Sequence, residues 1–188
     1  TLHWNSPRAP QDFDLQAPDA PDWLIDCRGL GARDQLRLRG VRGEVIRLHA
    51  PDVTLQRPTR LLHPRYPIYI APKPDHLFVI GATEIESEDL SEASVRSTLE
   101  LLSAAYTVHP GFGEARILEI ATQARPTLTD NLPCITLHGP RHISLNGLYR
   151  HGFLISPAML DAALEWLHQE TTEWALKWGL RVEDERNH

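Results

Sequence analysis

Apolar and polar positions alternate along much of the chain with the period of two that half-buried β-strands show. The stretches with this pattern are rich in β-branched and aromatic residues and are predicted to be strands. They span residues 23–27, 41–48, 66–72, 76–83, 115–126 and 142–149. Along the second strand, Val41, Val45 and Leu48 are expected to face inward. Lys73-Pro74-Asp75 is a turn sequence, so the third and fourth strands are predicted to form a hairpin.

Two other segments repeat apolar residues every three or four positions, which is typical of amphipathic helices. The first helix is expected to begin at Ser91 or Ser94 and to end at His109-Pro110-Gly111. Its repeating apolar positions are Val95, Leu99, Leu102 and Tyr106.

The second helix is expected to run from Ser156 to Trp178, with Ser156 as N-cap, Pro157 in the first helical position and Gly179 ending it. Its predicted buried face consists of Leu160, Ala163, Leu164 and Leu167.

The order of elements is strands, helix, strand, hairpin and helix, which differs from the regular alternation of a doubly wound domain. We therefore predict an α+β fold with a mainly antiparallel mixed sheet and flanking helices. Residues 1–21, 49–64 and 126–135 are rich in proline and polar residues and are expected to be connections. Asn146-Gly147 indicates a hairpin or tight turn.

Composition narrows the possible functions. The chain has 188 residues, 41% of them hydrophobic, and a net charge of −6, which disfavours a nucleic-acid partner. No apolar run approaches the ~20 residues that span a membrane, and no leader is recognisable. Cys27 and Cys134 lie in apolar surroundings, so we expect buried free thiols and a reducing, cytoplasmic location.

Several common catalytic motifs are missing. Among ten histidines, the closest pair is His138 and His142, but Gly139-Pro140 separates them and no further ligand follows at a recognisable spacing, so no metal site is expected. GxSxG and GxxxxGK[ST] motifs are absent from the sequence. The acidic run at 84–89 is expected to be a solvated loop.

Two features indicate a ligand. Arg125 lies at the end of a strand among small and apolar residues, where it either forms a structural ion pair or holds a carboxylate by two parallel hydrogen bonds. Arg150, His151 and Gly152 precede a predicted helix, whose first N–H groups attract an electron-rich or anionic edge. DWLIDCRGLGAR, at 22–33, has the Gly29-x-Gly31 of a dinucleotide turn without its third glycine.

Five segments together resemble a known family. In chain order they are DCRGLGAR, VRGEVIRL, YPIYIAPKPDHLFVIGATE, ARPTLTDNLPCI and LYRHGFLISPAMLDAAL. This set resembles the C-terminal half of the FAD-dependent amino-acid oxidases of the D-amino-acid oxidase superfamily, and most of all its glycine oxidase branch of thiamine biosynthesis. The likeness covers residues 22–168.

The resemblance implies the domain organisation and the reaction. Residues 1–46 would be part of the FAD-binding domain, with 1–21 loop-like, residues 47–126 the substrate domain, and residues 127–188 the return to the FAD-binding domain with its last helix. The family oxidises amino acids by hydride transfer from the α-carbon to the flavin, and oxygen is the final acceptor. A small amino acid, glycine or a D-amino acid, would be the substrate.

The resemblance also implies roles for individual residues. The substrate-binding residues would be Arg125, Tyr69, Arg150 and Glu84, with Thr83 beside them in the pocket. The cofactor-binding residues would be Arg150, His151, Gly152, Phe153, Leu154, Gly29 and Gly31.

Three departures from the family pattern matter. The family's N-terminal GxGxxG is absent, Tyr149-Arg150-His151-Gly152 differs from the usual loop, and Glu84 replaces an apolar residue. We therefore expect the isolated chain to be inactive and to need the missing N-terminal half as a partner, and a homo-oligomer is possible. The alternative is a non-catalytic module that binds a carboxylate or a protein partner.

Overall fold

The computed structural model describes residues 1–65 and 67–186, so Tyr66 of the predicted strand 66–72 lies outside the described residues. The chain divides into two units, which are described separately. Unit 1 comprises Thr1–Arg39 and Pro126–His188, and unit 2 comprises Gly40–Arg125. The role of each unit in binding substrate or cofactor stays a prediction.

Unit 2 is built on a five-stranded sheet with the order β3-β4-β5-β2-β6. Strands β2 with β5, β3 with β4, and β4 with β5 pair antiparallel, which confirms the predicted hairpin. A short strand, β3, lies in the region expected to be a connection. The bounds are β2 Arg39–His49, β3 Thr59–Leu61, β4 Ile68–Lys73, β5 Leu77–Gly81, α1 Val95–Val108 and β6 Arg116–Thr127.

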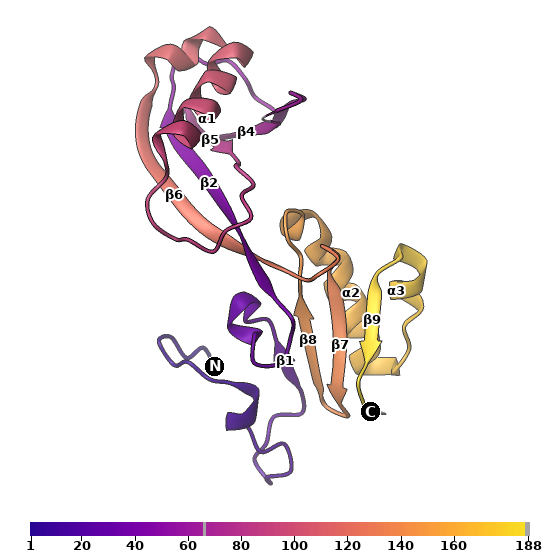
Figure 1. Cartoon of the computed structure of the whole chain (residues 1–188). Coiled ribbons are helices and arrows are strands. Elements are labelled where there is room, and N and C mark those ends of the chain that lie inside the picture. Colours follow the sequence, from indigo (N-terminus) through magenta and orange to yellow (C-terminus); the bar gives the residue numbers. More distant parts are fainter. Residues whose placement is uncertain (66, 187–188) are drawn as a thin grey trace. The chain divides into compact units, whose positions relative to one another are not determined.

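Helix α1 packs on one face of this sheet and closes the core of unit 2 (Figure 1). Ser94 caps it by accepting a hydrogen bond from the Ser97 N–H at 3.1 Å, as predicted. The predicted apolar face is wrong in part, because Val95, Leu99 and Tyr106 are 76, 59 and 57% exposed. The helix instead buries Leu101, Ala104 and Ala105, and the two small alanine side chains allow a close approach to the sheet.

The inward side of β2 also differs from the prediction. Ile46 and Leu48 lie in the core, whereas Val45 is half-buried on the other side of the strand. Val41 is buried outside this core cluster. Arg42 and Glu44 share the core side with Ile46 and Leu48, because side chains alternate along a strand. These two charged residues concealed the true apolar alternation.

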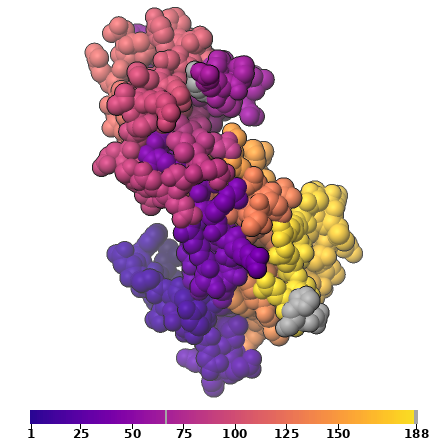
Figure 2. All heavy atoms as spheres, in the orientation of Figure 1, coloured from indigo at the N-terminus to yellow at the C-terminus, as the bar shows by residue number. Residues whose placement is uncertain are grey.

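Unit 1 contains a four-stranded sheet with the order β1-β8-β7-β9. β1 with β8 and β7 with β9 pair parallel, and β7 with β8 pairs antiparallel. The bounds are β1 Leu24–Asp26, β7 Cys134–Gly139, β8 His142–Asn146, α2 Gly152–Gln169, α3 Glu173–Trp178 and β9 Arg181–Asp184. Short 3₁₀ turns occur at Pro10–Asp12, Gly29–Ala32 and, in unit 2, Pro110–Glu114. The C-terminal segment, yellow in Figure 2, lies against the orange atoms of β7 and α2.

The single helix predicted for residues 156–178 is two helices. α2 begins at Gly152 and ends at Gln169, where the C-cap Glu170 has a φ of +54°, and Gly179 caps the end of α3 as predicted. Pro157 therefore lies inside α2 rather than in its first position, and Ser156 is not the cap.

The buried face of α2 is also offset from the predicted one. Leu160 and Leu164 are 51 and 40% exposed, and only Ala163 of the predicted face is fully buried, with Leu167 packed at the edge of the core. The residues that α2 buries in the core are Met159, Ala162, Ala163 and Trp166. As in α1, alanines belong to the side that packs closely, here together with the large side chains of Met159 and Trp166.

Two further expectations for unit 1 need correction. Asn146-Gly147 does not form a hairpin: the turn between β7 and β8 lies at Pro140-Arg141. Cys27 is exposed, and Cys134 is buried, with burial raising its pKa to about 11. Both thiols are free, as expected.

Within residues 1–65 and 67–186, no helix combines the length and the apolarity needed to cross a membrane.

Candidate functional site

One face of the unit 2 sheet, the face away from α1, carries two of the predicted substrate-binding residues. Tyr69 of β4 is paired with Gly81 of β5, and Gly81 is paired with Val45 of β2. Gly43 lies on the same side of β2 as Val45, two residues away. We call this surface, with Arg125 of β6 on it, the open face.

Two glycines make room for the polar side chains on the open face. A Cβ at Gly81 would lie 2.5 Å from the Tyr69 hydroxyl, and a Cβ at Gly43 would lie 2.2 Å from Nη2 of Arg125. The Tyr69 phenol and the Arg125 guanidinium therefore each lie directly over a glycine. Any side chain at these positions would displace the group above it.

The Arg125 guanidinium is oriented by two backbone carbonyls of its own unit. Its Nη1 donates to the Arg42 carbonyl at 3.2 Å, and its Nη2 donates to the Thr83 carbonyl at 3.1 Å. Both acceptors are neutral carbonyl oxygens, and they help to fix the plane of the guanidinium. Such a cation suits a carboxylate ligand.

A buried polar network lies on the opposite side of the sheet, beneath Arg125. Glu44 is 1% exposed, and its Oε1 accepts from Nε and Nη2 of Arg42 at 3.0 and 2.7 Å. Its Oε2 accepts from the Thr83 hydroxyl at 3.1 Å. Burial raises the pKa of the Glu44 carboxyl, but hydrogen bonds from Ser97, Arg42 and Thr83 outweigh burial and hold that pKa below its ordinary value.

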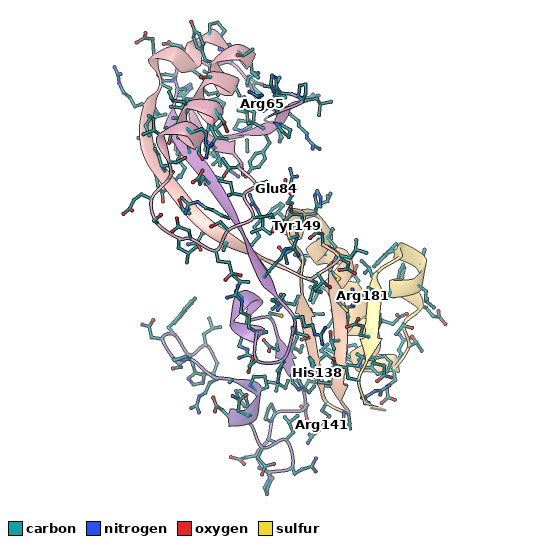
Figure 3. All side chains as sticks on the ribbon, viewed as in Figure 1. Arg65, Glu84, His138, Arg141, Tyr149 and Arg181 are labelled. Carbon is teal, nitrogen blue, oxygen red and sulfur yellow. The ribbon has the colours of Figure 1, made fainter. Side chains whose placement is uncertain are left out.

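Arg42 also ties this network to the segment that follows β5. Its Nη1 donates to the Asp89 carbonyl at 2.5 Å and its Nη2 to the Glu92 carbonyl at 2.9 Å. Backbone hydrogen bonds join Arg42 to Ile85 as a β-bridge. The predicted pocket residues Thr83 and Glu84 belong to this segment, Thr83 half-buried and Glu84 exposed after β5 (Figure 3).

In unit 1, two groups of predicted cofactor residues lie at the carboxyl ends of neighbouring parallel strands. The Gly29–Ala32 turn follows β1, and the 147–154 segment follows β8. The side chain of Asn146 joins them, because its Nδ2 donates to the Gly29 carbonyl at 3.0 Å. Gly29 has a φ of +58°, which glycine adopts without strain. In open sheets, this end of parallel strands is where ligands commonly bind.

The predicted flavin-contacting residues lead into α2. Tyr149, labelled in Figure 3, has a φ of +50° in the loop before the helix, and Arg150 and His151 are exposed. Gly152, Phe153 and Leu154 form the first turn of α2, with the Phe153 and Leu154 side chains 102 and 79% exposed. The Leu154 N–H donates to the His151 carbonyl at 3.0 Å. The positive end of a helix dipole at its N-terminus attracts an electron-rich group.

A second buried carboxylate stabilises the start of the Gly29 turn. Asp26 is 4% exposed, and Arg28 donates to its two oxygens through Nε and Nη2 at distances of 2.8 to 3.0 Å. Burial raises the pKa of the Asp26 carboxyl, and hydrogen bonds from the Arg28 side chain and N–H more than offset it, so the pKa is lowered. Gly31 lies within the same turn.

The histidine pair gives no metal centre in the part of the chain that the structure describes, where no group of three or more His, Cys, Asp or Glu side chains could hold an ion. The rings of His138 and His142 lie 4.6 Å apart. His138 interacts with Glu185 at 2.8 Å and with Ser144 at 3.0 Å.

Sequence reasoning named Arg125, Tyr69 and the residues at the start of α2, and missed those that position them. Gly43 and Gly81 provide the space, Glu44 the buried contacts and Asn146 the link between two turns. Arg42-x-Glu44, a charged pair on one side of an otherwise apolar strand, was the available signal.

Known proteins resemble this chain in sequence. A family model described as FAD dependent oxidoreductase (DAO) matches residues 10–165. A Rhizobium etli protein named as the thiamine biosynthesis oxidoreductase ThiO is 52% identical over 139 residues, covering 73% of this chain and 42% of that protein.

Solved structures agree with this assignment. Glycine oxidase of Geobacillus kaustophilus is 27% identical with a TM-score of 0.67, over 82% of this chain and 43% of that chain. Glycine oxidase of Bacillus cereus, at 22% identity and a TM-score of 0.70 over 81% of this chain and 44% of that one, shares the fold. The predicted α+β fold is thereby confirmed, and the chain spans less than half the length of these relatives. With its fold and most of its length matched, the chain belongs to the FAD-dependent oxidoreductase family of the D-amino-acid oxidase type.

Proposed function

We propose that this chain is the C-terminal, substrate-recognising part of a FAD-dependent oxidase that deaminates glycine or a D-amino acid. The observation that supports it most is the open face, where Arg125 lies over Gly43 and Tyr69 over Gly81. A cation whose plane is fixed by two carbonyls, on the same face as a phenol, suits an amino-acid carboxylate.

The other proposed substrate residues extend this recognition. Thr83 contributes a carbonyl to Arg125, and the exposed Glu84 follows it in the chain. Because Glu84 is acidic where the family commonly has an apolar residue, it would favour a substrate with a cationic group. Arg150, in unit 1, is proposed as a second contact to the substrate and to the cofactor.

The described residues of unit 1 fit a flavin. A flat, electron-rich ring edge needs N–H donors and a close backbone, and Gly152 with the N–H groups of the first turn of α2 offers both. Arg150, His151, Phe153, Leu154, Gly29 and Gly31 are the other residues that we propose to hold it. When bound, FAD would supply the hydride acceptor, and oxygen would reoxidise it after each turnover.

The chain's own contribution to the reaction is positioning. Arg125 and Tyr69 would hold the carboxylate of a substrate with a neutral amine, so that its α-hydrogen has one fixed direction. The imino acid that results hydrolyses to an oxo acid and ammonia. This reaction needs little acid–base catalysis, so we propose no residue as a catalytic acid or base.

The test is to supply the part of the relatives that this chain does not span. The chain is expressed alone and as a fusion to the residues that precede the matched region in the Rhizobium etli relative. We expect the isolated chain to bind FAD weakly or not at all, and the fusion to be yellow and to produce peroxide with glycine, sarcosine or D-amino acids. A yellow isolated chain with turnover would contradict the proposed dependence on the other half.

Gly43→Ala, compared with Gly139→Ala, tests the open face in the fusion. The added methyl at Gly43 displaces the Arg125 guanidinium, whereas at Gly139 the nearest atom would be 4.0 Å away. We expect Gly43→Ala to raise KM for glycine by about tenfold or more and Gly139→Ala to leave it unchanged. Equal KM values would refute carboxylate binding by Arg125.

The alternative function, a non-catalytic module that binds a carboxylate or a protein, predicts a different result. A fusion that remains colourless and inactive, while the chain alone still binds acetate, would favour that module. The dependence on a partner half and the cytoplasmic location are likewise proposals.

A further inference from the structure

The two residues whose carbonyls hold Arg125 are themselves held by one buried carboxylate. Arg125 donates to the carbonyls of Arg42 and Thr83. Oε1 of Glu44 accepts from the Arg42 guanidinium at 2.7 Å, and Oε2 of Glu44 accepts from the Thr83 hydroxyl at 3.1 Å. Each oxygen of Glu44 therefore bonds the side chain of a residue whose backbone carbonyl accepts from Arg125.

The backbone repeats this link. The Glu44 N–H donates to the Thr83 hydroxyl at 2.9 Å, and the Thr83 N–H donates to the Glu44 carbonyl at 3.3 Å. Thr83 follows the last strand residue of β5, where the sheet no longer fixes the chain. The Glu44 carboxylate adds a further link to the same residue, since its Oε2 accepts from the Thr83 hydroxyl.

Burying the charged Glu44 carboxylate costs free energy, which indicates that the residue has a specific role. Its side chain and that of Arg42 are 1% and 6% exposed, so both charges are removed from water. Such a pair contributes little net stability compared with apolar residues of the same size. What it provides is one fixed geometry, in which every hydrogen bond has a set direction.

We propose that Glu44 is a positioning residue that orients the guanidinium of Arg125 from the opposite side of the sheet, through Arg42 and Thr83. Glu44 does not contact the substrate. Its importance for substrate binding depends on the function proposed above, but its effect on Arg125 can be measured without any activity.

NMR of the 21.3 kDa chain tests this effect directly. A guanidinium held by two carbonyls rotates slowly and gives separate Nη–H signals, which the Arg125→Lys variant assigns by their loss. We expect Glu44→Gln, which keeps the shape and removes the charge, to merge or broaden these signals. Glu119→Gln is the matched control, because Glu119 lies on β6 in an exposed pair with Arg47. Separate, unchanged Arg125 signals in a folded Glu44→Gln chain would overturn the proposal.

Acetate serves as the carboxylate probe in the same samples. We expect the Kd for acetate at Arg125 to rise about tenfold in Glu44→Gln and to stay within about twofold in Glu119→Gln. If the unaltered chain shows no acetate response while Glu44→Gln still changes the Arg125 signals, carboxylate binding by Arg125 fails and the positioning role stands. If acetate binds equally well to both and the signals agree, the positioning role fails and carboxylate binding by Arg125 stands.

Thr83 gives a second test if Glu44→Gln does not fold. Thr83→Val removes only the hydroxyl that Glu44 holds, and Thr83→Ser keeps it. We expect Thr83→Val to broaden the Arg125 signals and Thr83→Ser to preserve them. Identical spectra for the two variants would overturn the proposal.

Discussion

Each unit buries one carboxylate beside an arginine two residues away in the sequence, but the two pairs are built differently. In unit 1, Asp26 pairs with Arg28, whose side chain is 25% exposed. In unit 2, Glu44 pairs with Arg42, whose side chain is 6% exposed. Both carboxyls have a lowered pKa, because hydrogen bonds to the charged form outweigh burial in each.

The two pairs differ in how far along the sequence their other hydrogen-bond partners lie. Arg28 bonds Asp26 and Asp34, so that pair stabilises one local turn. Arg42 and Glu44 bond Thr83, Asp89 and Glu92, about forty to fifty positions along the chain. Loss of the Asp26–Arg28 pair would disturb a single turn. The Arg42–Glu44 pair instead connects strand β2 with the segment after β5, which includes Thr83, whose carbonyl accepts from Arg125.

The largest effect is expected for Glu44→Ala. The change leaves the Arg42 guanidinium buried beside a void, and we expect unit 2 to lose about 3–5 kcal/mol of stability. Hydrogen exchange followed by mass spectrometry resolves the two units, and faster exchange should appear in peptides of β2, β5 and α1. Unchanged exchange there would show that Arg42 finds other partners.

A smaller effect is expected for Asp26→Asn. Arg28 reaches solvent, so it can be hydrated when the carboxylate is neutralised, and we expect a loss of about 1–2 kcal/mol. Exchange should rise in β1 and the Gly29 turn, with unit 2 unaffected. A loss as large as that of Glu44→Ala would mean that exposure of the arginine does not set the cost.

The pH dependence of the unfolding free energy should reflect the protonation of both Asp26 and Glu44. A carboxyl whose pKa is lowered by folding stabilises the protein above its unfolded pKa, and this contribution disappears as pH falls through the lower folded pKa. Urea unfolding should therefore show stability falling on acidification below the ordinary carboxyl range. Glu44→Gln and Asp26→Asn should each flatten this fall, and a slope equal to that of the unaltered chain would refute the contribution.

The smallest effect is expected for Glu119→Gln. Its partner Arg47 is 52% exposed and Glu119 itself 48%, so water already solvates both charges. We expect less than about 1 kcal/mol in urea unfolding, and less again at high salt. A larger loss of unfolding free energy would show that this exposed pair stabilises the protein as much as the buried pairs do.

Sequence reasoning found most of the strands and failed at faces and boundaries. The hairpin of β4 and β5 was recognisable because its turn residues and β-rich flanks are local. The buried faces of α1 and α2 were misplaced because Ala104, Ala105, Ala162 and Ala163 pack closely, while larger apolar residues beside them stay exposed. The break at Glu170 and strand β9 depend on partners elsewhere in unit 1, which no local pattern reveals.

The same division holds for the candidate site. Local motifs in their order pointed to Arg125, Tyr69 and the start of α2, and to a family that the comparisons confirm. Residue types alone could not show that Gly43 and Gly81 lie beneath these groups, since the contacts join β2 to β6 and β5 to β4.

The sequence by itself thus determined the fold class and the family, and it predicted Arg125 as the cation for a carboxylate, because these depend on local pattern and residue chemistry. Only the tertiary structure decided which side of β2 is buried and that Glu44 bonds the side chains of both residues whose carbonyls accept from Arg125. The reason is physical: burial of a charge is favourable only where distant parts of the chain supply its hydrogen bonds, and pairing across a sheet sets those distances.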